Sequence, residues 1–423
     1  MSIDPDVRTT TLTNGLRIAT ALMPGFRTVA ISAYLRVGSR DEPAPLNGLS
    51  HFFEHMVFKG TEQRDARAIT LEIERVGGSI NAYTAKDHTA CETVMLAEHA
   101  DTALDVLADV LTRSVFPADE IERERRVILQ ELGDAADDPE SVAQDAFDAL
   151  AFARQPLGRP IMGSARNVRR ITRDDLLAHQ RRHCTASNLV ITGVGGVDHD
   201  RFVAMVEQRF GHLPAGEPLP RVKARYVGGF KHLDDDTEQT SVVLGWPIPG
   251  RTDPRHATYE LLGELLGGGM SSPLFQAVRE QRGLAYQIDA WTDGLEDGGL
   301  LQVTAGVSPR NLRELLHVTL DVVHSAARRI DADDVERSRN QQAMRLARSL
   351  ERPASLAEWL GRDLLMHDRI VLPGERLAQT LAIDEAALRA ATAEMLSARP
   401  TLTLAGRAGR GNPETLLERA MAG

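Results

Sequence analysis

The 423-residue sequence predicts an α+β protein of two homologous domains, each a mostly antiparallel sheet with helices packed on one face. The order of strand and helix patterns in the first half recurs in the second, which is typical of an old duplication. A chain of this length is also too long for one hydrophobic core. Residues 213–220 hold three prolines and a glycine, a composition typical of a linker. We therefore predict domains at 1–212 and 227–423, joined by a linker at 213–226.

Turn residues and alternating apolar positions define the strands of both halves. Asn14-Gly15, for example, is typical of a tight turn between two antiparallel strands. The predicted strands are residues 9–13, 16–21, 29–35, 79–84, 88–97 and 188–194 in the first half, and 240–246, 285–291, 299–307 and 401–405 in the second.

Apolar positions three and four residues apart define the helices, and glycine or proline ends most of them. The first helix contains residues 51–55, with Asn47 or Ser50 as its N-cap and Gly60 at its end. The other predicted helices are residues 68–75, 100–116, 119–132, 141–152, 173–183 and 199–210, and then 256–266, 272–281, 309–329, 331–351 and 384–396.

The first helix carries His51, Glu54 and His55 in a His-x-x-Glu-His pattern. Because a helix turns about 100° per residue, the two histidines lie about 40° apart on one face. Two such imidazoles share a tetrahedral zinc at about 2.0–2.1 Å, and the glutamate between them reaches a water on that metal. Glu54 would take the proton of this water and pass it to a leaving amine. The pattern occurs by chance roughly 0.03 times in such a chain. The alternative, two hydrogen-bonded core histidines, leaves Glu54 without an obvious partner.

A third protein ligand is expected from the first half, because helix 256–266 of the second half carries apolar residues where the first helix has histidines. Glu124 and Glu131 are the leading candidates, since residues seven apart share one face of a helix. The apolar residues 127–129 favour Glu131 over Glu124 as the buried carboxylate. The alternative is that the charged run 119–126 forms an ordinary solvated face.

Composition excludes several classes of protein. The formal net charge of −11 argues against nucleic-acid binding and permits basic or unfolded peptides as partners. No apolar run approaches about 18–20 residues, so no membrane span is expected. Residues 1–17 are polar and resemble no targeting signal, and Cys91 and Cys184 form no disulfide framework. We therefore expect a protein of the bacterial cytoplasm.

Several stretches that follow one another along the chain resemble one family: residues 48–61, 78–84, 124–131, 156–161 and 266–286. This is the pitrilysin/insulinase family of zinc peptidases. The resemblance is closest to its short branch, which includes the β subunit of the mitochondrial processing peptidase and its bacterial relatives. The matching stretches follow one another in order over residues 48–286, which is more than half of the chain.

The resemblance implies a role for each residue of the pattern. It implies that His51, His55 and Glu131 bind one Zn²⁺ per chain, and that Glu54 is the general base. Glu124 matches a second acidic position that supports the site, and we expect it to orient one of the histidines.

The resemblance also implies how a peptide is held. Asn81 and Ala82 match an edge strand to which the substrate adds as a further β-strand. Arg279 and Tyr286 match a pair, in the half without metal ligands, that grips the substrate near the cleaved bond. Without the family, Arg279 would be read as a surface charge and Tyr286 as a core aromatic residue. Because one chain carries both sets, the resemblance implies a homodimer that forms a clamshell chamber.

These observations predict a zinc metalloendopeptidase that cleaves peptides or presequence-like segments inside a closed chamber. Zinc-bound water would attack the peptide carbonyl, with Glu54 as base. Two alternatives remain: a catalytically inactive structural subunit, like the core proteins of respiratory complexes, and a binding protein that captures extended peptides without cutting them.

Overall fold

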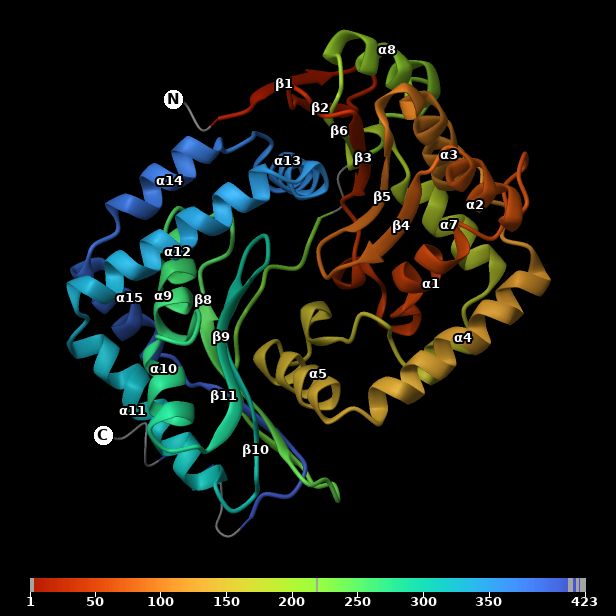
Figure 1. Ribbon diagram of the computed structural model, residues 1–423. Coiled ribbons are helices and arrows are strands. Elements are labelled where there is room, and N and C mark those ends of the chain that lie inside the picture. Colours follow the sequence, from red (N-terminus) through yellow and green to blue (C-terminus); the bar gives the residue numbers. More distant parts are fainter. Residues whose placement is uncertain (1–3, 218–219, 410–413, 416–417, 419–423) are drawn as a thin grey trace. The chain divides into compact units, whose positions relative to one another are not determined.

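The computed structural model describes residues 4–217, 220–409, 414–415 and 418. The chain forms two compact units (Figure 1). The first unit is Met1–Leu132, Arg159–Val222 and Ala347–Gly374, and the second is Gly133–Gly158, Lys223–Leu346 and Glu375–Gly423.

The first unit is built on a six-stranded sheet of order β1-β2-β6-β3-β5-β4. Neighbouring strands are antiparallel except β2 and β6. The strands are β1 Asp6–Thr11, β2 Arg17–Leu22, β3 Thr28–Leu35, β4 Ser79–Thr84, β5 Thr89–Leu96 and β6 Leu189–Gly195. Its helices are α1 Leu49–Met56, α2 Ala66–Arg75, α3 Ala100–Thr112, α6 Ala165–Val168, α7 Arg173–His183, α8 His199–Phe210 and α13 Pro353–His367.

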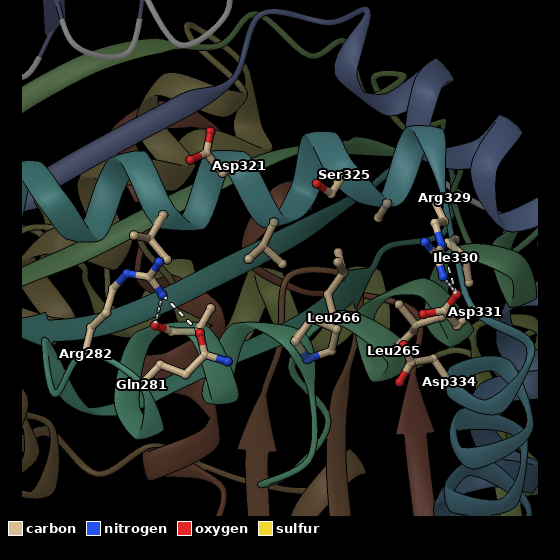
Figure 2. Close-up of a pocket in the computed structure, with 15 residues that line it drawn as sticks. Leu265, Leu266, Gln281, Arg282, Asp321, Ser325, Arg329, Ile330, Asp331 and Asp334 are labelled. Atoms are coloured by element: carbon tan, nitrogen blue, oxygen red, sulfur yellow. Dashed lines mark hydrogen bonds and ion pairs between the residues drawn. The ribbon is translucent and has the colours of Figure 1, made fainter.

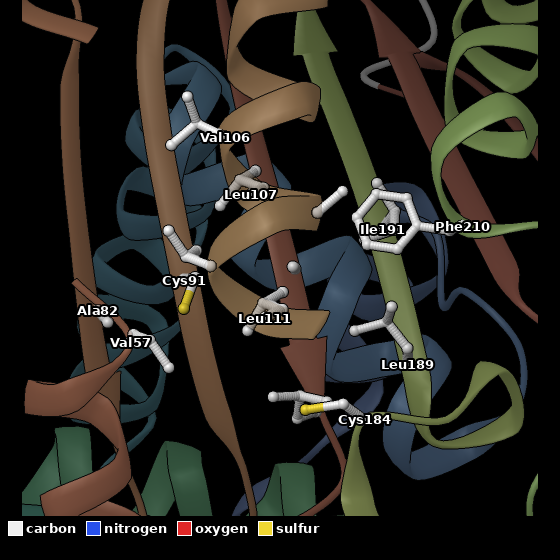
Figure 3. Packing of buried hydrophobic residues seen from close by; sticks show 14 of the residues in the cluster. Val57, Ala82, Cys91, Val106, Leu107, Leu111, Cys184, Leu189, Ile191 and Phe210 are labelled. Carbon is white, nitrogen blue, oxygen red and sulfur yellow. The ribbon is translucent and has the colours of Figure 1, made fainter. Parts of the chain in front are cut away.

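Both faces of this sheet are covered, because successive residues of a strand point to opposite faces. In β3, Val29 and Ile31 pack into the core that α1 and α3 share, whereas Ala30 and Tyr34 pack against α13. The buried cysteines Cys91 and Cys184 belong to the first of these cores (Figure 3). Both thiols are free, and burial raises the pKa of Cys184 to about 12.

The second unit repeats this plan around a five-stranded sheet of order β7-β11-β8-β10-β9, antiparallel except for β7 and β11. The strands are β7 Gly229–Leu233, β8 Thr240–Ile248, β9 Ala285–Gly294, β10 Gly299–Val307 and β11 Thr401–Ala405. Its helices are α5 Pro139–Ala151, α9 His256–Gly267, α10 Pro273–Phe275, the π-helical turn η6 Gln276–Glu280, α11 Leu312–Arg328, α14 Pro373–Ala382 and α15 Glu385–Leu396. Helices α4 Ala118–Ala136 and α12 Ala332–Leu350 each connect one unit to the other, as does α14, whose first two residues belong to the first unit.

The two sheets match strand for strand when β1 is set aside, including the position of the single parallel pair. Each half of the sequence also contributes one helix to the sheet of the other half, and in each half this helix directly follows the long helix α4 or α12. Helix α5 comes from the first half and packs on the second sheet, where Phe147 contacts the core around Val243 and Leu300. Helix α13 comes from the second half and packs on the first sheet.

The α+β class is confirmed, and each sheet also carries one helix on the face that was expected to be bare. The domain limits 1–212 and 227–423 stay a prediction about the two sequence halves. The compact units differ from those limits because α5 and α13 bury their apolar faces on the opposite sheets. Among the described residues, no helix combines the length and the apolar character of a membrane span.

Candidate metal centre and catalytic site

The buried carboxylate of Glu42 binds the N-terminal end of helix α1. Glu42 accepts hydrogen bonds from the backbone N–H groups of Gly48, at 2.8 Å, and Ser50, at 2.6 Å, and from the side chain of Asn47. The expectation that Asn47 or Ser50 caps this helix is therefore wrong, because a side chain earlier in the loop reaches the free N–H groups first. Gly48 precedes the helix with φ of 102°, and a Cβ there would lie 2.6 Å from the carbonyl oxygen of Met162.

One face of α1 is fixed in the core by Leu49, Phe52, Phe53 and Met56. The other face presents His51, Glu54 and His55, all half-buried. The two imidazole rings lie edge to face with centroids 4.7 Å apart. Burial, and then the neighbouring His55, lower the pKa of His51 to about 4. His51 is thus neutral at physiological pH, which is the form that ligates a metal.

The side chain of Glu131 on α4 meets the two histidines. Its Oε2 atom lies 3.8 Å from His51 Nε2 and 3.6 Å from His55 Nε2. The ligand atoms of these three residues all lie within 4.8 Å of one another. Ligands at about 2.0–2.1 Å from a tetrahedral zinc are about 3.3 Å apart, so small side-chain rotations close the set. Two imidazoles and a carboxylate are also a donor set that catalytic zinc uses, and the three residues therefore fit the metal.

Glu124 and Glu131 differ in burial in the opposite sense to the prediction. On α4 the buried residues are Ile121, Glu124 and Ile128, which share one face, and Glu131 extends that face towards solvent. The Glu131 side chain is 38% exposed and that of Glu124 only 8%. The expectation that Glu131 is the buried carboxylate is wrong, although Glu131 is the one that meets both histidines.

Glu124 bridges His55 and a lysine. Its Oε2 atom lies 3.1 Å from His55 Nδ1, and its Oε1 atom lies 2.8 Å from Lys59 Nζ. Burial raises the pKa of Glu124, but the hydrogen bonds from Lys59 and His55 outweigh it and hold the pKa below its usual value. The family resemblance predicts that Glu124 orients a histidine but does not point to Lys59, whose only sequence signal is its position one turn after His55.

Glu54 lies beside the histidines without joining their converging atoms. Burial raises the pKa of Glu54. Hydrogen bonds from Thr84 and the electrostatic attraction of the nearby His55 oppose that rise. Thr84 is the last residue of β4, and it also donates a hydrogen bond to the carbonyl of Ser50 in α1. The end of β4 therefore lies directly against the helix that carries the histidines (Figure 1).

Strand β4 is the outermost strand of its sheet and carries Asn81 and Ala82. It pairs with β5 on one side, where Asn81 faces Glu92 and Ala82 faces Cys91. No further described strand pairs with its other side, which is the edge to which the resemblance adds a substrate strand.

Arg279 and Tyr286 lie together in the second unit. The Arg279 guanidinium is placed between two rings, 4.8 Å from the centroid of Phe275 and 4.6 Å from that of Tyr286. Tyr286 is 79% exposed, so the reading of this residue as a core aromatic is wrong. Arg279 lies in the π-helical turn η6, a conformation common at functional sites.

The second unit has an ion pair between the two helices that follow the same order as α1 and α4. Helices α9 and α12 correspond to α1 and α4, and Glu264 of α9 pairs there with Arg345 of α12. A hollow of about 340 Å³ opens beside the end of α9, with Leu265 and Leu266 on its wall (Figure 2). Within the described part of the chain, His51, His55 and Glu131 are the one group suited to a metal ion.

Comparison with known proteins also divides the sequence into two successive domains. The family model described as insulinase, peptidase family M16, matches residues 17–165, and the model described as the peptidase M16 inactive domain matches residues 170–342. An uncharacterised zinc protease of Streptomyces coelicolor is 37% identical over 410 residues, covering 95% of this chain and 89% of the relative. The chain belongs to the insulinase family, M16.

Further M16 relatives agree. A probable mitochondrial-processing peptidase subunit beta of Arabidopsis thaliana is 35% identical over 400 residues, covering 91% of this chain and 75% of the relative. A crystal structure described as the peptidase M16 inactive domain from Pseudomonas fluorescens has a TM-score of 0.89 at 21% identity, and covers 96% of this chain and 99% of that one. That likeness confirms the fold.

Proposed function

We propose that this M16 protein is a zinc metalloendopeptidase that cleaves peptides or presequence-like segments. The observation that carries the proposal is the convergence of His51, His55 and Glu131, with the carboxyl of Glu54 beside them. Zinc held by these residues, one ion per chain, would polarise the peptide carbonyl and acidify water. The names of the zinc-protease relatives support the choice of metal.

Glu54 performs the proton transfers. As a carboxylate it accepts a proton from the attacking water, and as a carboxylic acid it returns that proton to the leaving nitrogen. The burial that raises its pKa favours the first role, because a more basic carboxylate accepts the proton of the water more readily.

The extended substrate adds to the outer edge of β4 at Asn81 and Ala82, and backbone pairing makes this capture tolerant of sequence. Arg279 and Tyr286 donate to the carbonyl oxygen that becomes negative, within the chain or across a homodimer. We propose such a clamshell homodimer, which encloses the peptide in a chamber, and the bacterial cytoplasm as its location.

The test combines metal analysis with a quenched fluorescent peptide assay. The parent protein should contain zinc and cleave the peptide, and a chelator should abolish cleavage. Glu54→Gln should keep its zinc and lose at least about 10²-fold in turnover, the scale of a general base. Glu122→Gln, an exposed glutamate on α4, is the matched control and should cleave as the parent does. Equal turnover of Glu54→Gln and the parent would refute the mechanism.

A peptide-binding or structural role without cleavage is the second candidate, and the match of residues 170–342 to an inactive-domain model supports it. A protein that binds the labelled peptide but does not cut it, even when zinc is supplied, would establish this role and overturn the first.

A further inference from the structure

A chain of three side chains runs from the candidate metal centre to the surface. His55 Nδ1 lies 3.1 Å from Glu124 Oε2, and Glu124 Oε1 lies 2.8 Å from Lys59 Nζ. The two oxygens of one buried carboxylate thus have different partners, the imidazole on one side and the ammonium on the other. The Lys59 side chain is 29% exposed, so its ammonium is at the outer end of the chain.

The backbone around Lys59 is fixed, and this limits where its ammonium can lie. The N–H of Lys59 donates to the carbonyl of Met56 at 3.1 Å, which adds a turn to the end of α1. The next two residues form β-bridges, Gly60 with Asp65 and Thr61 with Ser114. Gly60 has φ of 135°, a conformation that favours glycine, so the chain turns sharply after Lys59.

We propose that Lys59 is a positioning residue for the metal centre, acting through Glu124 on His55. This inference rests on the proposed metal site and adds a residue to it. Lys59 holds one oxygen of Glu124, so that the other oxygen is directed at His55 Nδ1. His55 then carries its ring proton on Nδ1, and the lone pair of Nε2 is directed towards His51 and Glu131.

The ammonium also balances charge. Glu54, Glu124 and Glu131 bring three carboxyl groups to the region, and Glu124 is the most buried of the three. Without a cation, that buried carboxylate would lose its counter-charge and one of its hydrogen bonds. The imidazole would then lose the fixed acceptor that sets its tautomer and ring orientation. Loss of such an outer partner weakens metal binding by about 10–100-fold in known sites.

The test measures the zinc dissociation constant of the full-length protein by competition with a chromogenic chelator, without reference to peptide cleavage. Lys59→Met and Lys59→Gln, which remove the charge, should each bind zinc about 10–100-fold more weakly than the parent. Lys59→Arg keeps a cation at this position and should remain within about threefold of the parent. Lys231→Met is the control, because Lys231 lies exposed on β7 in the second unit.

A double-mutant cycle with Glu124→Gln separates positioning from a general loss of structure. If Lys59 acts through Glu124, then Lys59→Met should weaken zinc binding little further in a Glu124→Gln background. Thermal unfolding of each zinc-free variant shows whether it is folded. Should Lys59→Met fail to fold, Lys59→Gln and Lys59→Arg carry the comparison.

The outcomes separate this inference from the proposed function. A parent protein that binds no zinc overturns both. A parent that binds zinc, together with a Lys59→Gln variant that binds it equally well, overturns the role of Lys59 and leaves the metal centre intact. Additive effects of Lys59→Met and Glu124→Gln would show that Lys59 does not act through Glu124.

Discussion

Shortening Glu131 by one methylene group tests the metal centre without removing any charge. In Glu131→Asp the carboxylate retreats by about 1.5 Å, the length of one C–C bond. Helix α4 cannot follow, because Ile121 and Ile128, which are 4% and 0% exposed, fix it in the core. The present separations of 3.6 and 3.8 Å from the histidine nitrogens would widen towards about 5 Å, well beyond the spacing of about 3.3 Å in a tetrahedral site.

We therefore expect Glu131→Asp to lose at least about 100-fold in zinc affinity. This is the upper end of the range for changing a residue that only hydrogen-bonds to a metal ligand, and Glu131 is proposed as a ligand itself. The loss should also be visible in stability, because a ligand that binds the folded state stabilises it by RT ln(1 + [L]/Kd). At a zinc concentration 1,000 times the parent Kd, the parent gains about 4.1 kcal/mol, whereas a 100-fold weaker variant gains about 1.4 kcal/mol. Urea unfolding with and without zinc measures both values.

Glu122→Asp is the matched control for this prediction. It makes the same change on the same helix, at a side chain that is 66% exposed and pairs with Arg125. It should bind zinc as the parent does. If Glu131→Asp and Glu122→Asp gain the same stability from zinc, Glu131 is not a ligand and the geometric reasoning fails.

Two further predictions concern the metal-free protein. Burial raises the pKa of Glu54 above its ordinary value of 4.5, so the charged form costs stability once the pH exceeds the folded pKa. Glu54→Gln should thus be more stable than the parent at pH 7 in urea, with a gap that narrows on acidification; a gap independent of pH would contradict this. In Gly361→Ala, the new Cβ would lie 2.2 Å from two ring carbons of the fully buried Tyr34, so we expect a loss of about 1–3 kcal/mol in urea unfolding. An unchanged stability would show that α13 does not pack on the first sheet as described.

Much of the local structure followed from the sequence. The His-x-x-Glu-His spacing placed His51 and His55 on one helix face because the helical repeat alone fixes that relation. Alternating apolar residues and glycine turns predicted most strands of both sheets, and their order predicted the duplication. The family resemblance added Arg279 and Tyr286, which no local pattern distinguished.

The tertiary structure decided what depends on contacts between distant segments. Whether Glu124 or Glu131 is buried depends on how α4 lies over α1. The apolar residues 127–129 were a poor guide because α4 buries only Ile128 of the three, and the face that Ile128 shares with Glu124 and Glu131 reaches solvent at Glu131. Helix α13 was not predicted, and nothing local indicates that it covers the first sheet rather than the second. The link from Lys59 through Glu124 to His55 likewise joins residues separated along the chain. Helical periodicity is set within a few residues, whereas these contacts form only when distant apolar faces are buried together.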